Sequence, residues 1–263
     1  MNILDQIIES KKRSLGEKKD WYGIKKLEAS PFFDRECESL VKRLNNAGTT
    51  GIIAEFKRKS PSKGIINDKA GIDGVVNDYE NYGAAGISIL TDEEYFGGFT
   101  EDLVKAREIV DIPLLRKDFI IDEYQVVEAK SMGADVILLI AACLTPAEVK
   151  RLAGLAKNLG LEVLLELHAE EELEHICDGI ELIGINNRDL KTFEVDIERS
   201  LRMAKQIPAD KTKVAESGIS DVETIKRFKK AGFRGFLIGE TFMKEEDPGK
   251  ALERFVKKLK QYE

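Results

Sequence analysis

An eightfold alternation of short apolar runs and helix-like segments limits what this chain can fold into. Each run ends in a polar or glycine-bearing tip, and successive tips lie roughly 20 to 35 residues apart, the length of one strand–helix unit. Near-continuous apolar runs are typical of parallel strands that are buried on both faces. Eight such units predict an α/β fold, a closed (β/α)8 barrel. The runs are Gly51–Phe56, Ala85–Leu90, Ile112–Leu115, Ala134–Ile140, Leu161–Leu165, Glu181–Ile185, Thr212–Ala215 and Gly235–Ile238.

The segments between these runs carry helix-start and helix-stop signals. Thr145, Pro146 and Glu148 form a capping box with proline at the first helical position, and Ser220 and Glu223 form a second box. Glycine is favoured just past a helix end, where the backbone turns left-handed. Such glycines are Gly83, Gly133, Gly160 and Gly232. The predicted helices are Lys69–Asn81, Thr100–Val110, Asp122–Ser131, Pro146–Leu159, Ala169–Ile176, Asp196–Gln206, Asp221–Lys230 and Pro248–Lys260.

Residues 1–48 precede the first run and have no strand partner in the eightfold pattern. An apolar stripe that includes Ile3, Ile7 and Leu15 predicts a first helix, and a second helix is expected over Arg35–Asn45. No Pro/Gly/Ser-rich linker divides the chain. We therefore predict one barrel domain over residues 1–263, with residues 1–48 as a helical N-terminal extension that covers an end of the barrel. Whether the extension is a plain cap or a lid over the site is open.

The charge balance limits the partners. The 263 residues include 41 basic and 48 acidic side chains, a net charge of −7, which argues against nonspecific binding to nucleic acid or acidic membranes. Cys37, Cys143 and Cys177 are widely spaced and indicate reduced thiols. The N-terminus lacks a signal-peptide pattern, and no apolar run approaches the roughly 20 residues of a membrane span. We expect a cytoplasmic protein with a small-molecule partner.

The first strand ends in the densest cluster of charged residues. Glu55 and Lys57 lie two apart, so their side chains point the same way, into the barrel mouth if Phe56 faces the helices. A charged pair inside a barrel is costly unless it is paired or used. The alternative is a purely structural ion pair. Lys59 and Lys63 are expected to be solvated loop charges.

Three further strand tips supply polar groups to the same mouth, because the carboxyl ends of barrel strands converge. Lys117 follows a buried run, and a lysine beside carboxylates can act as a general acid. Glu166 emerges directly from a core run, where a carboxylate is rarely placed for stability alone. Asn186 and Arg188 offer amide and guanidinium donors suited to carboxylate or hydroxyl groups.

The last two strand tips carry glycines. Barrels of this kind often bind phosphate at the seventh and eighth strands through backbone N–H groups and a helix N-terminus. Ser217 with Gly218, and Gly239 with Glu240, occupy these positions. The Glu240 carboxylate is an awkward neighbour for phosphate, and we expect it to point away while its N–H donates.

Metal and nucleotide motifs are missing from the sequence. It contains no HxH, HExxH or cysteine cluster and no GxGxxG or Walker pattern, so we expect neither a metal nor an organic cofactor. Of the two histidines, His168 is more typical of a loop than of the site, and His175 lies mid-helix without an expected role.

Taken together, the residues resemble the indole-3-glycerol phosphate synthase family of tryptophan biosynthesis. The resemblance extends in order over nearly the whole chain, including the N-terminal extension. Its blocks are IAEFKRKSPSKG (53–64), SILTDEEYFGG (88–98), LRKDFI (115–120), LLELH (164–168), IGINNRDL (183–190), AESGI (215–219) and LIGE (237–240).

The resemblance implies a TIM barrel and a carbon–carbon lyase, EC 4.1.1.48. The substrate would be 1-(o-carboxyphenylamino)-1-deoxyribulose 5-phosphate, and ring closure, decarboxylation and dehydration would give indole-3-glycerol phosphate. By matching position, Lys117 resembles the general acid at the carbonyl. Glu166 and Lys57 resemble the acid/base groups of closure and dehydration, with Glu55 holding the lysines. How the roles divide between the two lysines is open.

The remaining family positions would bind the substrate. The residues that would orient the substrate next to the catalytic groups are Asn186, Glu216, Ser217 and Arg188. The aromatic ring of the substrate would pack on Phe96 and Phe119. Those that would hold phosphate are Ser60, Gly218, Gly239 and the Glu240 N–H. Some relatives carry serine at the position of Glu240. A backbone contact to phosphate survives that change, whereas a contact through the serine hydroxyl does not. The resemblance implies no cofactor; we expect a monomer, with association with other enzymes of the pathway left open.

Two competing functions fit the fold. A phosphoribosyl aminoaldose–ketose isomerase of the same pathway needs one acid and one base, and it would not require two inward lysines. A catalytically silent phosphate-binding or scaffold protein would be expected to lose Lys117 or Glu166, and both are present.

Overall fold

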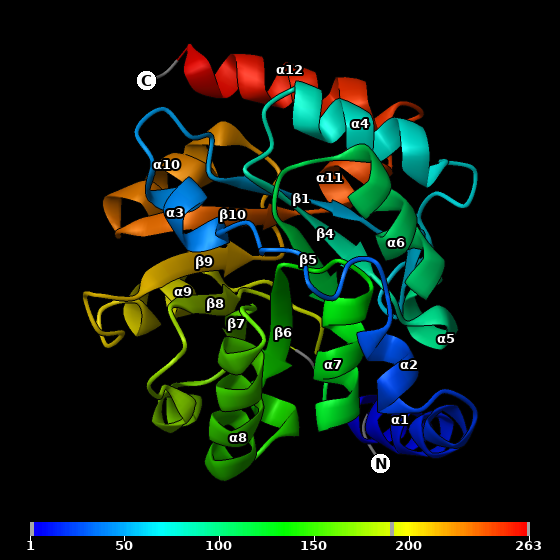
Figure 1. The fold of residues 1–263 in the computed structure, drawn as a ribbon. Helices are drawn as coiled ribbons and strands as arrows, with labels where there is room; N and C mark the ends of the chain where they lie inside the picture. Colours follow the sequence, from blue (N-terminus) through cyan, green and yellow to red (C-terminus); the bar gives the residue numbers. More distant parts are fainter. Residues whose placement is uncertain (1–2, 190–191, 262–263) are drawn as a thin grey trace.

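The computed structural model describes residues 3–189 and 192–261. Met1 and Asn2 of the extension and Leu190 of the fifth family block lie outside the described residues. Eight parallel strands close into a barrel in the order β1-β10-β9-β8-β7-β6-β5-β4 (Figure 1). The closing pairs join Ile52 to Phe236 and Ile53 to Gly86. The predicted barrel is confirmed.

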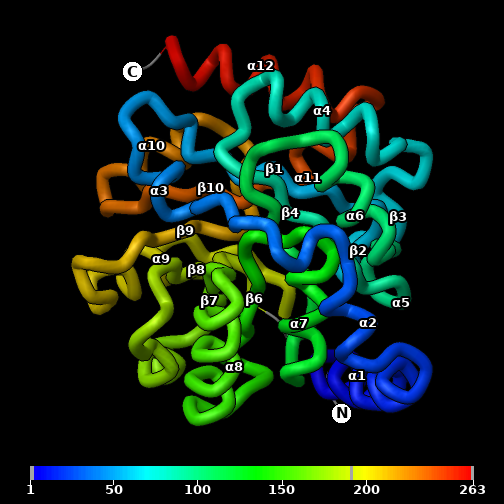
Figure 2. The backbone as a smooth tube through the Cα atoms, viewed as in Figure 1, coloured from blue at the N-terminus to red at the C-terminus, as the bar shows by residue number. Residues whose placement is uncertain are grey.

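The barrel strands agree with the eight apolar runs to within two residues at either end. They are β1 (Ile52–Phe56), β4 (Gly86–Leu90), β5 (Leu114–Lys117), β6 (Val136–Ile140), β7 (Glu162–Leu167), β8 (Leu182–Asn186), β9 (Thr212–Glu216) and β10 (Phe233–Ile238). Nearly all of their residues are buried, because one face meets the barrel interior and the other meets the surrounding helices. A hairpin of β2 (Lys59–Ser60) and β3 (Gly64–Ile65) follows β1 (Figure 2).

A ring of helices surrounds the strands. The long ones are α4 (Ile72–Asn81), α6 (Thr100–Ile109), α7 (Glu123–Ser131), α8 (Pro146–Asn158), α9 (Ile197–Met203), α10 (Val222–Lys230) and α12 (Pro248–Lys260). Shorter ones are α5 (Glu93–Phe96), η1 (Ala141–Cys143) and α11 (Glu240–Met243). The capping box of Thr145 and Glu148 is confirmed, and the four predicted glycines have positive φ.

Three predicted helix details were wrong. Residues predicted as the helix Ala169–Ile176 form a 3-10 helix, η2 (Glu170–His175), where Glu172 folds back to accept the His168 N–H. Helix α10 is capped by Asp221 rather than Ser220, because the Asp221 carboxylate accepts the Thr224 N–H at 2.8 Å.

The third error concerns Arg35–Asn45, where only α3 (Leu40–Asn45) is helical. The residues before α3 are not helical, because their polar groups bond to Asp135 instead. Asp135 Oδ1 accepts hydrogen bonds from Arg35 Nη2 at 2.5 Å and from the Glu38 N–H at 2.7 Å. Helix α3 closes the N-terminal end of the barrel. Its Leu40 and Leu44 are 1% exposed and enter the interior, where Gly86 and Gly235 leave them space.

The rest of the extension lies elsewhere on the barrel. Helix α1 (Ile3–Trp21) and helix α2 (Ile24–Glu28) lie next to α7 at the edge of the molecule (Figure 1). Ile7 of α1 lines the cavity at the opposite end from α3. The extension therefore covers both ends of the barrel, not one as predicted. Among the described residues, no helix is long and apolar enough to cross a membrane.

Candidate active site

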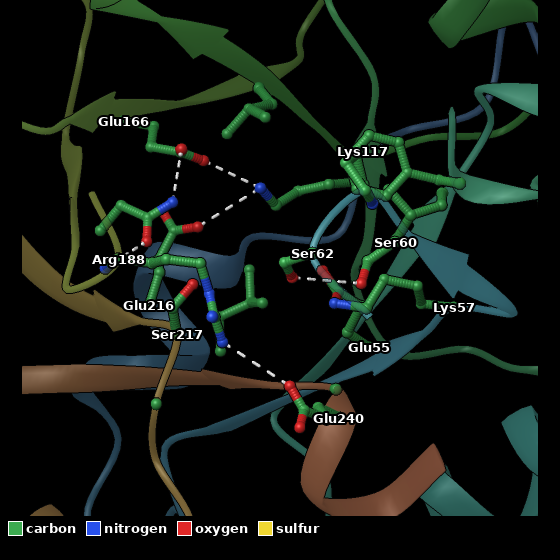
Figure 3. A pocket seen from close by; sticks show the side chains of 18 of the residues that line it. Glu55, Lys57, Ser60, Ser62, Lys117, Glu166, Arg188, Glu216, Ser217 and Glu240 are labelled. Atoms are coloured by element: carbon green, nitrogen blue, oxygen red, sulfur yellow. Dashed lines mark hydrogen bonds and ion pairs between the residues drawn. The ribbon is translucent and has the colours of Figure 1, made fainter. Parts of the chain in front are cut away.

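A cavity of about 350 Å³ opens at the carboxyl ends of the strands. All of the site residues predicted from the sequence line it. They are Glu55, Lys57, Ser60, Phe96, Lys117, Phe119, Glu166, Asn186, Arg188, Glu216, Ser217, Gly218, Gly239 and Glu240. Figure 3 shows side chains from strands far apart in the sequence pointing into one space.

Lys117 is the centre of the charged cluster. Its Nζ lies 2.8 Å from Glu166 Oε2 and 3.4 Å from Glu216 Oε2 (Figure 3). The Asn186 amide donates to Glu166 Oε1 at 2.9 Å, which fixes the carboxylate from the other side. Burial alone would lower the pKa of Lys117, but the neighbouring carboxylates, Glu166 first, raise it above its usual range. Lys117 is therefore an ammonium at neutral pH.

The pKa values of the two carboxyl groups beside Lys117 are shifted in opposite directions. Burial would raise the pKa of Glu166, but the Lys117 ammonium holds it well below its usual range. Burial and the nearby Glu166 charge raise the pKa of Glu216 well above its usual range. The site thus holds two carboxyl groups whose pKa values are shifted in opposite directions, an arrangement that can separate acid and base roles.

A second ion pair lies on β1. Lys57 Nζ lies 2.5 Å from Glu55 Oε1, and Phe56 between them faces the helices, as predicted. The prediction that Glu55 holds both lysines was wrong. Glu55 contacts Lys57 and acts on Lys117 only through its charge, because the closer carboxylates of β7 and β9 hold Lys117.

The predicted phosphate end is lined by Ser60, Gly218 and Gly239, but the Glu240 side chain does not point away. Its Oε2 lies 3.6 Å from Nη2 of Arg188, which lines the cavity (Figure 3), and its Oε1 lies 3.6 Å from Lys63 Nζ. The predicted phosphate end therefore holds a carboxylate that is paired with two cations.

Two of the loop charges next to β1 have partners that the sequence did not reveal. Arg58 makes two hydrogen bonds to Asp102, at 2.5 and 2.9 Å. Lys59 Nζ donates to the Glu94 backbone oxygen at 2.6 Å. These contacts hold the β2–β3 hairpin against α5 and α6.

Helix α1 forms one wall of the cavity, in line with the alternative, left open by the sequence, that the extension lies over the site. Ile3, Leu4 and Ile7 line it. On the same helix, Lys11 Nζ lies 2.8 Å from Asp92 Oδ2 and 2.7 Å from Asp118 Oδ1. Asp92 caps α5, which carries Phe96, and Asp118 follows Lys117, so Lys11 joins α1 to both. The spacing of the apolar residues in α1 predicted a buried helix face, but not which part of the barrel that face contacts.

The aromatic wall is formed by Phe96 and Phe119, whose ring centroids lie 6.1 Å apart at 37°. His168 also lines the cavity, although its sequence position suggested a loop. It stands two residues after Glu166, and this spacing was the signal that could have placed both on one face. In the described parts of the chain, no group of three or more acidic, histidine or cysteine side chains could hold a metal ion.

Comparison with known proteins identifies the relatives of this barrel. A family model described as "Indole-3-glycerol phosphate synthase" matches residues 4–255. The chain belongs to the indole-3-glycerol phosphate synthase family. The family predicted from the sequence is confirmed, and the match includes nearly all of the extension and all eight strands of the barrel.

Individual members of the indole-3-glycerol phosphate synthase family match over almost their full length. The enzyme of Bacteroides thetaiotaomicron is 50% identical over 258 residues, covering 98% of this chain and 99% of the relative. That of Salinibacter ruber is 45% identical over 257 residues, covering 97% and 95%. Among solved structures, thiamine phosphate pyrophosphorylase from Pyrococcus furiosus covers 85% of this chain and 98% of its own at a TM-score of 0.61 and 17% identity. That likeness supports the barrel fold alone.

Proposed function

We propose that this cavity closes the indole ring of 1-(o-carboxyphenylamino)-1-deoxyribulose 5-phosphate, with loss of carbon dioxide and water, to give indole-3-glycerol phosphate. As a member of its family the chain is a carboxy-lyase of tryptophan biosynthesis, EC 4.1.1.48. The observation that carries the residue roles is the position of the buried Lys117 Nζ, 2.8 Å from Glu166 Oε2 and 3.4 Å from Glu216 Oε2.

Ring closure requires a proton at the substrate carbonyl. The ring carbon that bears the carboxylate attacks the ketone carbon, and we assign Lys117 the proton delivered to the developing oxyanion. Carbon dioxide then leaves with its bond electrons returning to the ring. This step follows from the substrate's own electronics, and the protein positions the reacting atoms.

Dehydration requires a second acid and a base. We assign Lys57, held by Glu55, to protonate the departing hydroxyl, and Glu166 to take the proton from the adjacent methylene carbon. Asn186 fixes Glu166 through its 2.9 Å hydrogen bond. Arg188, Glu216 and Ser217 orient the substrate.

The ends of the substrate fit opposite parts of the cavity. Phe96 and Phe119, with the apolar wall of α1, suit the aromatic ring. Ser60, Gly218, Gly239 and the Glu240 N–H suit the phosphate, which displaces the Glu240 carboxylate from Arg188.

The direct test is product formation. Purified chain, treated with EDTA and dialysed, is mixed with the named substrate, and indole absorbance and fluorescence are followed. We expect indole-3-glycerol phosphate, and no isomerase activity on phosphoribosyl anthranilate above background. No indole under any condition would overturn the reaction; activity restored only by added metal would overturn the metal-free scheme.

We also propose that residues 1–263 act as one domain, as a monomer in the cytoplasm. Continuous apolar packing between strands and helices supports one domain, and three free cysteines suit a reducing compartment. The chain mass is 29.5 kDa, so sedimentation equilibrium at that mass supports the monomer, and twice that mass contradicts it.

A further inference from the structure

The His168 imidazole lies buried beside Glu166 without an aligned hydrogen bond. It is 7% exposed, and its Nε2 lies 3.0 Å from Glu166 Oε1, but off the direction in which a hydrogen bond forms. Neither ring nitrogen has an aligned partner among the described residues. Buried polar atoms are almost always bonded, so an exception at an active site calls for a functional reason.

A second carboxylate stands on the other side of the ring. Glu172, from η2, has Oε2 4.0 Å from His168 Nδ1 and accepts the His168 backbone N–H at 2.5 Å. The Glu172 side chain is 16% exposed, against 3% for Glu166. Glu166, His168 and Glu172 therefore form a line from the buried end of the cavity toward solvent. The 4.0 Å gap is closed by a small movement of the ring or by one water molecule.

Two other titratable groups next to this line, Lys117 and Cys143, do not exchange protons near neutral pH. In the resting site the Lys117 side chain is an ammonium with a raised pKa, so it cannot take a second proton from Glu166. Burial, followed by the charges of Glu166, Glu172 and Asp5, raises the pKa of the Cys143 thiol, which therefore stays neutral. Imidazole is the side chain suited to exchanging protons near neutral pH.

We propose that His168 is a positioning residue that passes the proton taken up by Glu166 to Glu172 and solvent, and so resets Glu166 for the next turnover. The proposal rests on the role of Glu166 as base in the proposed function. The Glu166 carboxyl gives its proton to Nε2, the Nδ1 proton leaves to the Glu172 carboxylate, and Glu172 releases it to water. The transfer leaves His168 as the Nε2–H tautomer. Because neither ring nitrogen has an aligned hydrogen bond, the ring is free to rotate and present its unprotonated nitrogen to Glu166 again.

The route matters because bound substrate fills the mouth. Glu166 is 3% exposed and lines the cavity, which the substrate occupies during the chemical steps. Glu172 does not line the cavity, so the path through His168 stays open while the site is full.

The test uses His168→Gln, which keeps a polar side chain beside Glu166 but cannot relay a proton. In dilute, non-imidazole buffer we expect kcat to fall about 10-fold, at the lower edge of general acid–base effects, with KM unchanged. Added imidazole should restore most of the loss, and the solvent deuterium isotope effect on kcat should rise. Thermal unfolding checks that the variant is folded.

Two variants test the geometry. Glu172→Gln keeps an oxygen that can accept the His168 N–H but cannot take a proton, so it should lower kcat in the same buffer-dependent way. His175→Gln is the matched control on the same segment. His175 Nδ1 lies 3.0 Å from the Glu172 backbone oxygen, and its Nε2 lies 2.9 Å from the Leu144 backbone oxygen. Losing these contacts should lower the stability of the protein, but kcat should not depend on buffer concentration.

Two results would overturn the relay. One is a His168→Gln enzyme with wild-type kcat at every buffer concentration. The other is a slow enzyme that neither imidazole nor higher buffer concentration improves. Both require a wild-type chain that forms indole; a wild-type chain that forms none contradicts the proposed function instead.

Discussion

The Glu216 carboxylate occupies the space that a side chain at Gly184 would fill. A Cβ at Gly184 would come within 2.1 Å of Glu216 Oε1. Gly184 lies on β8 between Glu166 of β7 and Val214 of β9 in the strand register. The missing side chain therefore lets two carboxyl groups from separate strands converge on one lysine.

Gly184→Ala should push Glu216 out of its position. We expect kcat to fall about 10-fold or more, since transition-state groups tolerate little displacement, and unfolding free energy to fall by about 1–3 kcal/mol from overpacking. Steady-state kinetics and urea unfolding measure the two effects. Gly154→Ala is the control: it lies exposed on α8 with no atom within 4 Å of a new Cβ, and it should leave kcat unchanged.

Lys117→Ala should lower kcat by roughly 100-fold or more, the scale of a general acid, with a modest change in KM. Lys59→Ala is the matched control, because that lysine lies outside the cavity and binds a backbone oxygen. Single-turnover measurements separate chemistry from binding. A Lys117→Ala enzyme with near-normal turnover would remove this residue from the mechanism.

Glu216→Gln should raise stability at pH 7 while lowering activity. The pKa of Glu216 is raised in the folded protein, so above the unfolded value of about 4.3 the unfolded chain releases this proton and the folded chain keeps it. Stability is therefore lost as pH rises, and the variant avoids that loss. We expect a Tm higher by about 2–4 °C at pH 7 and no difference near pH 4.

Glu128→Gln should show the opposite slope. Burial would raise the pKa of Glu128, but Arg116 and Lys18 lower it, so its stabilisation is present above the unfolded value and is lost as pH falls through the folded one. The variant should be less stable at pH 7, with the difference shrinking in acid. Equal pH slopes for both variants would contradict these assignments.

Inorganic phosphate should compete with substrate at the loops after β9 and β10. Gly218→Ala should weaken this inhibition, because Gly218 has φ +70° and a Cβ would meet Val195 Cγ1 at 2.4 Å. Gly160→Ala carries similar strain, φ +76°, but lies away from the cavity with open space around it. It should lower stability without changing phosphate inhibition. Purely noncompetitive inhibition would count against the site.

Removing residues 1–22 should raise KM and lower Tm, because α1 supplies an apolar wall and the Lys11 anchor. Removing residues 1–45 should be far more damaging, since it also strips Leu40 and Leu44 from the barrel interior. Kinetics and thermal unfolding of the two truncations make the comparison. Unchanged KM in the shorter truncation would reduce α1 to a structural cap.

The barrel and the strand-tip residues could be predicted from sequence because both depend on local order. An apolar run fixes a strand, and the residue at its end, such as Lys117 or Glu166, must then reach the mouth. Contacts between loops have no such rule. The Glu240 pairing with Arg188, the place of His168, and the wall formed by α1 depend on distances between segments far apart in the chain. The non-helical path of Arg35 depends likewise on an aspartate 100 residues later.

The position of α3 has a consequence for how the protein is made. Leu40 and Leu44 leave the ribosome early, yet Asn45 bonds to Thr212 of β9, and β1 pairs with β10. At about 5–20 residues per second, these partners arrive about 10–40 seconds later. Until then the two leucines have no barrel to enter. A nascent chain that stalls before β9 therefore displays an uncovered apolar helix, which makes this segment a natural target for chaperones during translation.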